Sequence, residues 1–153
     1  MEPTVAKTPV HLWLVGVLSL LWNSFGAYDY FMTRTRNTDY LSSMPGLTAE
    51  QILAYVDSFP LWAQAAWGFG VWGALLGSIL LLMRNRWAVT AFAVSLAGAI
   101  ISFAYQYAGP PAPAPMNEGA MAIMPIVIIA VAALLYFYAY RQRASGALRS
   151  PSA

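Results

Sequence analysis

Apolar residues are concentrated in four long runs, which are separated by short stretches rich in polar residues, Gly and Pro. The runs cover residues 11–32, 61–83, 87–107 and 119–140. A helix rises ~1.5 Å per residue, so about 20 apolar residues are enough to cross a hydrocarbon layer of ~30 Å. Open β-sheets cannot cross it, because lipid leaves their edge backbone groups unpaired. The pattern predicts an all-α membrane protein with a four-transmembrane-helix bundle in residues 1–143 and a disordered cytoplasmic tail in 144–153.

The first loop, between residues 33 and 60, contains the signature of a further short helix. Thr48 and Gln51 have the spacing of a capping box, and Glu50 lies in the first turn, where a negative charge is favourable. Ile52 and Val56 are four residues apart and share one face of such a helix. We therefore predict a short amphipathic helix that lies on the outer surface of the bundle.

Charged residues make up only 9% of the chain, against ~25% in an average soluble domain. In a four-span topology, one side of the membrane carries six Lys and Arg residues and the other carries only Arg34 and Arg36. Cytoplasmic loops are enriched in Lys and Arg, so both termini are predicted to be cytoplasmic. A cleaved signal peptide is the alternative for residues 11–32, but this run is longer than the usual 7–15 apolar residues.

Small residues recur every three or four positions in the second and third runs, which places them along one stripe of each helix. Such stripes let helix backbones approach closely in lipid. The candidate packing residues are Gly70, Gly73, Gly77, Ser95, Gly98 and Ser102.

The residue types needed for most catalytic and metal sites are scarce. The chain has no cysteine and a single histidine, His11, at the predicted cytoplasmic end of the first span. This composition argues against thiolate sites, typical zinc sites and bis-histidine haem. No catalytic residue, metal or other cofactor is expected, and neither enzymatic activity nor nucleic-acid binding is predicted.

Polar and aromatic side chains gather in the outward halves of the first three spans. They form a candidate outer vestibule of Asn23, Tyr28, Asp29, Tyr30, Gln64, Trp67, Tyr105 and Gln106. If these side chains converge, they suit a neutral polar solute such as a sugar. The alternative is an outer aromatic belt together with one interhelical hydrogen bond from Asn23. Asp29 is either functional or satisfied structurally, by water or by Arg36 seven residues later.

Two strings carry a family resemblance: LWNSFGAYDYFMTRTRN at residues 21–37 and VWGALLGSILLLMRNRWAV at residues 71–89. They resemble a family of small bacterial inner-membrane proteins with four helices and no established activity, some of which are labelled sugar transporters. The resemblance implies a multi-pass protein of the bacterial inner (cytoplasmic) membrane. It places Asn23, Asp29 and Tyr30 on the family's most recognisable motif.

Three functional hypotheses follow. The leading one is a non-enzymatic integral membrane protein that binds a small polar solute or a partner helix from the outer side. The second is a sugar-like transporter, which four helices per chain would form only as a homodimer. The third is an accessory subunit of a larger membrane complex. The shared Ala-Tyr-x-Tyr strings at residues 27–30 and 104–107 also leave an internal duplication of two hairpins open.

Overall fold

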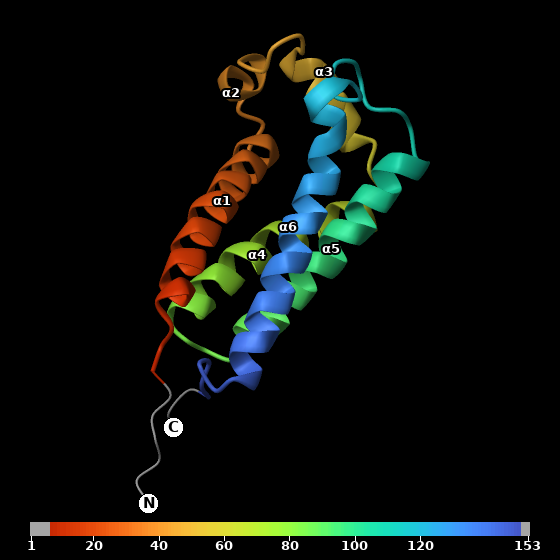
Figure 1. Cartoon of the computed structure of the whole chain (residues 1–153). Coiled ribbons are helices and arrows are strands. Elements are labelled where there is room, and N and C mark those ends of the chain that lie inside the picture. Colours follow the sequence, from red (N-terminus) through yellow and green to blue (C-terminus); the bar gives the residue numbers. More distant parts are fainter. Residues whose placement is uncertain (1–6, 151–153) are drawn as a thin grey trace, which may run out of the picture.

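The structure, a computed structural model, describes residues 7–150, and within this range it contains six helices and no β-strand (Figure 1). The four long helices are α1 (Val10–Arg34), α4 (Leu61–Leu82), α5 (Ala88–Ala108) and α6 (Gly119–Ala144). Each is long and apolar enough to cross a membrane. The predicted all-helical fold with four candidate spans is thus confirmed, and the helix bounds differ from the predicted ones by at most a few residues.

The long helices pack mainly in chain order, with α4 against α1 and α5, and α5 against α6. The contact between α4 and α5 brings the two backbones together. A Cβ atom added at Gly98 would lie 2.5 Å from the backbone oxygen of Ala66 and 2.6 Å from the backbone nitrogen of Gly70. Ser95 donates a hydrogen bond of 2.6 Å from its hydroxyl to the carbonyl oxygen of Gly70. The stripe of small residues therefore serves as the α4–α5 packing surface.

Helix α1 packs against α4. Its buried residues between positions 12 and 27 are spaced three or four apart and form one stripe: Leu12, Gly16, Ser19, Asn23 and Ala27. Near the start of α1, a Cβ added at Gly16 would lie 2.4 Å from the side chain of Leu82, so the two helices are close there. At the same end, His11 bonds through its Nδ1 to the hydroxyl of Tyr138 on α6 at 2.5 Å, and Leu12 is fully buried against the end of α6. The beginning of α1 is thus tied to both α4 and α6.

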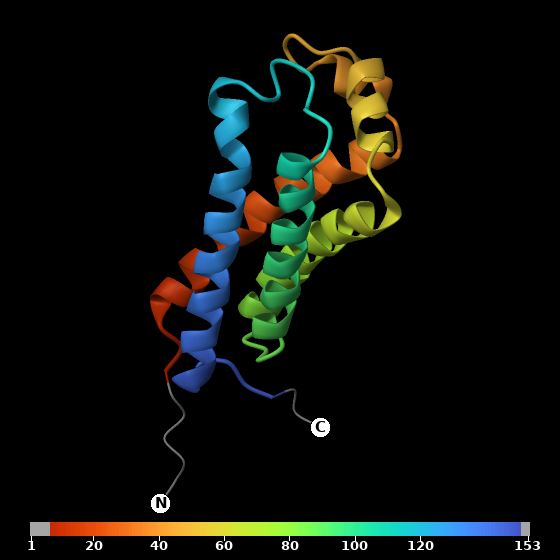
Figure 2. The ribbon, with the colours of Figure 1, turned by 90° about the vertical axis from the view of Figure 1, so that its right-hand side faces the viewer.

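Two short helices and the 109–118 linker cover the opposite end of the bundle (Figures 1 and 2). Helix α3 (Ala49–Asp57) begins with a complete capping box between Thr48 and Gln51. Helix α2 (Thr38–Ser42) begins at Asn37, whose side-chain oxygen accepts a bond from the backbone N–H of Tyr40. Apolar side chains of both helices and of the linker form one buried cluster that reaches Trp67 on α4. We call this layer, residues 37–59 and 109–118, the cap.

The end of the chain differs from the predicted disordered tail. Helix α6 continues to Ala144, and Ala147 and Leu148 are buried at 3% and 5% exposure. The backbone of Arg149 pairs with the turn after α4, donating to the carbonyl of Arg84 at 2.7 Å and accepting from the N–H of Arg86 at 2.9 Å. Residues 145–150 are mostly polar or small, and the burial of Ala147 and Leu148 is enough to hold this segment against the bundle. Residues 151–153 of the predicted tail lie outside the described part.

Candidate functional site

A cavity of about 320 Å³ lies among the four long helices, bounded by α1, α4, α5 and α6. Figure 2 shows the reason: α1 runs obliquely to α6, so the two helices are close at the start of α1 and separate toward the cap. The apolar lining includes Trp22, Phe25 and Gly26 of α1, Trp67, Val71 and Ala74 of α4, Phe92, Ala99 and Phe103 of α5, and Met124, Ile128, Val131, Ala132 and Leu135 of α6. This volume falls in the range of ~300–1,000 Å³ found for small-molecule sites.

The cavity opens on the side of the bundle, where α1 and α6 separate. Three of the lining side chains are also exposed on that surface, namely Trp22 at 42%, Phe25 at 72% and Met124 at 45%. They come from α1 and α6, the two helices that separate. In a membrane this surface faces lipid, so the entrance is lateral and lies between α1 and α6.

Four polar side chains line the cavity, and two of them are already engaged in helix packing. Asn23 donates its amide to the hydroxyl of Ser78 at 2.8 Å and to the carbonyl of Ala74 at 3.2 Å. Ser95 bonds to α4 as described above. Ser102 differs from both: it is 2% exposed, and its hydroxyl has no hydrogen-bond partner within the described residues.

Asp29 is the fourth polar residue, and it lies on the side of the cavity nearest the cap. Its Oδ1 accepts a hydrogen bond of 2.8 Å from the hydroxyl of Tyr40. Burial, followed by this bond to the Asp29 carboxylate, raises the pKa of the Tyr40 phenol above its ordinary value. The contact joins α1 to α2 and fixes one carboxylate oxygen of Asp29.

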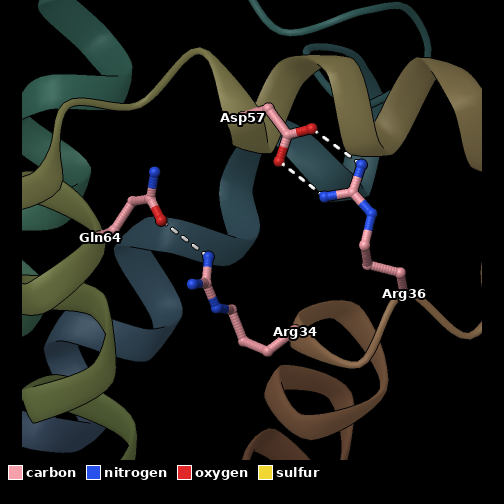
Figure 3. Close-up of polar contacts among 4 residues, drawn as sticks. All are labelled: Arg34, Arg36, Asp57 and Gln64. Atoms are coloured by element: carbon pink, nitrogen blue, oxygen red, sulfur yellow. Dashed lines mark hydrogen bonds and ion pairs between the residues drawn. The ribbon is translucent and has the colours of Figure 1, made fainter.

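The hypothesis that Arg36 pairs with Asp29 is wrong, because Arg36 instead forms a bidentate ion pair with Asp57 at the end of α3, at 2.9 and 3.0 Å (Figure 3). Helix α1 ends at Arg34, so the helical spacing that would place residues seven apart on one face does not extend to Arg36. Arg36 has a φ of 57°, which turns the chain out of the helix. The neighbouring Arg34 bonds to the side-chain oxygen of Gln64 at 2.7 Å (Figure 3).

The structure brings only part of the predicted vestibule together. Of the eight candidate residues, Asn23, Asp29 and Trp67 line the cavity. Tyr30 lies outside its lining and packs edge-on against Trp67 and Trp72 on α4. Tyr28 is 48% exposed and contacts the ring of Tyr40.

The other three candidates serve the junction between the cap and the long helices. Gln64 donates to the carbonyl of Phe59 at 2.8 Å while accepting from Arg34. Tyr105 packs against the ring of Phe59 and donates to the carbonyl of Ser58 at 3.3 Å. Gln106 is half-buried and lies outside the cavity lining.

The residues that sequence reasoning missed are the apolar ones. Phe103 of α5 and Ile128, Val131 and Ala132 of α6 line the cavity, yet in sequence they are indistinguishable from residues that simply face lipid. The cavity-lining residues differ from the outward-facing ones only because α1 runs obliquely and leaves a space beside them. The spacing of apolar residues in the sequence does not predict this course of α1.

The fold and the cavity define a class: an all-helical protein with four helices able to cross a membrane and an apolar, laterally open cavity between the first and the last of them. Residues 7–150 contain no group of three or more His, Asp or Glu side chains placed to hold a metal ion. Comparisons with protein families, with curated proteins and with solved structures find no match to this chain.

Proposed function

We propose that this chain is a non-enzymatic integral membrane protein that takes a single-chain amphiphile from the bilayer into the cavity between α1 and α6. The observation that carries the proposal is the lateral mouth, where Trp22, Phe25 and Met124 are at once cavity lining and exposed surface. An alkyl chain can enter such a mouth without leaving an apolar environment. Its polar end then lies toward Asp29 and the cap.

The lining favours an alkyl chain over the neutral sugar suggested by the sequence. A buried hydroxyl without a hydrogen-bond partner costs ~1–3 kcal/mol, and a sugar carries several hydroxyls. The cavity offers few polar groups, and those of Asn23 and Ser95 are largely engaged with α4. Apolar and aromatic side chains supply nearly all of the remaining wall.

We also propose that both termini lie on the cytoplasmic side of a bacterial inner membrane. The support is the distribution of basic residues together with the family resemblance of residues 21–37 and 71–89. The mouth of the cavity then lies mainly in the outer leaflet, and the cap faces the outer aqueous phase.

A photoreactive fatty alcohol tests the proposed uptake. The protein is reconstituted in nanodiscs with a long-chain alcohol that carries a diazirine in its chain, and the labelled peptides are mapped by mass spectrometry. We expect labels on the α1 segment 22–29 and on the α6 segment 124–135. Ala132→Trp places a large side chain in the cavity and should reduce this labelling several-fold.

Ala130→Trp is the matched control, since Ala130 is on the same helix but exposed away from the cavity lining. It should leave the labelling of both segments unchanged. Labels spread evenly over all lipid-facing helix surfaces, with no difference between the two variants, would contradict the proposal.

A further inference from the structure

We infer that the amphiphile taken by this cavity is cationic and carries an ammonium head group that pairs with Asp29. The inference rests on the proposed function, because it concerns the ligand of the same cavity. It starts from a property of the wall: Asp29 is the one acidic residue that lines it, and no basic residue does.

The carboxylate of Asp29 is free to accept a cation. Within residues 7–150 the one ion pair is that of Arg36 with Asp57, so Asp29 has no cationic partner there. Only its Oδ1 is engaged, by the neutral hydroxyl of Tyr40. The nearest arginine in sequence, Arg34, is held toward the start of α4 by its bond to Gln64, as Figure 3 shows.

A carboxylate beside an apolar cavity is unfavourable unless it is compensated by charge. Ionisable residues inside membrane spans are costly and are usually paired or functional. An ammonium group supplies the missing charge, whereas a neutral head group supplies none and an anionic one is repelled by Asp29.

The aromatic residues of the wall favour the same ligand. Trp67 lines the cavity along with Asp29 and also packs against the buried cluster of the cap, and indole rings attract cations, an attraction that strengthens when the cation is desolvated. An alkylammonium ion therefore finds a carboxylate and an indole ring at one end, and an apolar channel for its chain at the other.

Ser102 is an independent sign that this cavity accepts a ligand with a polar group. Its hydroxyl is buried, lacks a hydrogen-bond partner and belongs to a residue of the cavity wall. Serines in helices commonly bond to their own backbone, as Ser19 does to the carbonyl of Gly16 at 3.0 Å. A polar group of a ligand near the head end would satisfy the Ser102 hydroxyl.

The test compares three probes with the same chain and different head groups: dodecyltrimethylammonium, 1-dodecanol and dodecyl phosphate. Binding to the protein reconstituted in nanodiscs is followed by its tryptophan fluorescence, to which Trp22 and Trp67 of the cavity contribute. We expect the cation to bind roughly tenfold more tightly than the alcohol, and the anion most weakly. Asp29→Asn should abolish the preference for the cation while leaving dodecanol binding in place.

Two further variants separate charge from structure. Asparagine keeps an oxygen for the Tyr40 hydroxyl, so Asp29→Asn preserves the contact with α2. Tyr40→Phe removes that contact and keeps the charge, so it should retain the preference for the cation. Asp39→Asn removes an exposed acid of α2 and is the matched charge control; it too should retain the preference.

The failures of the two proposals are distinguishable. Equal affinities for the cation and the alcohol, unchanged by Asp29→Asn, would overturn the ammonium inference and leave the amphiphile site standing. Absence of binding by all three probes would overturn both.

Nanodiscs distinguish the two sources of an ammonium head. Selective retention of sphingosine, a single-chain lipid with an ammonium head group, over oleate in native mass spectra would assign the site to a lipid. Displacement of the photoreactive label by dodecyltrimethylammonium, without retained sphingosine, would assign it to a free amphiphilic cation. Either result supports the inference.

Discussion

Asn23 of α1 donates its side-chain amide to the hydroxyl of Ser78 on α4 over 2.8 Å, and the two residues are only 8% and 0% exposed. The same amide nitrogen lies 3.2 Å from the carbonyl of Ala74, to which Ser78 also donates at 3.0 Å. These bonds join the middle of α1 to α4. The geometry therefore gives Asn23 a packing role at the edge of the cavity.

We predict that Asn23 and Ser78 are energetically coupled. Interhelical hydrogen bonds in membranes contribute ~0.6–2 kcal/mol, so Asn23→Leu should lower the free energy of unfolding by about that amount. Ser78→Ala should cost a similar amount, and the double variant should cost less than the sum of the two. A double-mutant cycle on the reconstituted protein measures this coupling. Strictly additive effects would show that the bond contributes nothing.

The amino-acid sequence predicted the long helices well because an apolar run of about 20 residues has few other solutions in a membrane. The capping box at Thr48 and Gln51 was readable for the same reason, since it is a local pattern. Helix α2 was missed because its five residues depend on a single cap from Asn37. The anchored end of the chain was missed because only Ala147 and Leu148 carry it.

The candidate site was less predictable than the fold. The polarity of residues near the outer ends of the helices pointed to Asn23, Asp29 and Trp67, which do line the cavity. The same polarity also pointed to Gln64 and Tyr105, which instead connect the cap to the long helices. Lateral separation of α1 from α6 is a tertiary property, and no local pattern of residues encodes it.

Glycine substitutions provide a second prediction, about the closeness of α4 and α5. Gly98→Ala places a methyl group 2.5 Å from the backbone oxygen of Ala66, and backbone atoms cannot give way without moving a helix. Overpacking of this kind typically costs ~1–3 kcal/mol. We expect a marked loss of thermal stability in detergent.

Gly26→Ala is the matched control, because a Cβ at Gly26 meets no atom within 4 Å. Alanine has the higher helix propensity, by ~1 kcal/mol, so this variant should be as stable as the wild type or slightly more so. Equal stability of the Gly98 and Gly26 variants would mean that α4 and α5 are not in backbone contact.

The stabilising contribution of the protonated Tyr40 phenol, which donates to Asp29, should decrease in alkaline solution. Burial and the bond to Asp29 raise the pKa of Tyr40, so the folded state favours the protonated phenol. A group whose pKa is higher in the folded state than in the unfolded state stabilises the fold fully at a pH below its unfolded-state pKa, which is ~10 for tyrosine. This stabilisation is lost as the pH rises above that value. Between about pH 9 and pH 12, the melting temperature should therefore fall more in the wild type than in Tyr40→Phe. Parallel curves for the two proteins would contradict the assignment.

Orientation is testable because the chain contains no cysteine. Single cysteines at Ser42, on α2 in the cap, and at Ser150, at the other end of the bundle, both replace exposed residues. A membrane-impermeant maleimide added to intact bacterial cells should label the first and not the second. Disruption of the membrane should make the second reactive as well. Labelling of both in intact cells would exclude the four-span topology.

The last prediction concerns the end of the chain, where sequence and structure differ most. Leu148 is 5% exposed and packs in the same cluster as Leu12 and Leu81. Truncation of a buried leucine to alanine typically costs ~2–5 kcal/mol, so Leu148→Ala should lower the melting temperature clearly. Leu134→Ala is the control, since Leu134 is 69% exposed on the outer side of α6 and should tolerate the change.

Termination after Gly146 removes Leu148 together with the backbone bonds of Arg149, so it should destabilise the protein at least as much as Leu148→Ala. A truncated protein as stable as the full chain would show that residues 147–150 do not hold the ends of α1, α4 and α6 together.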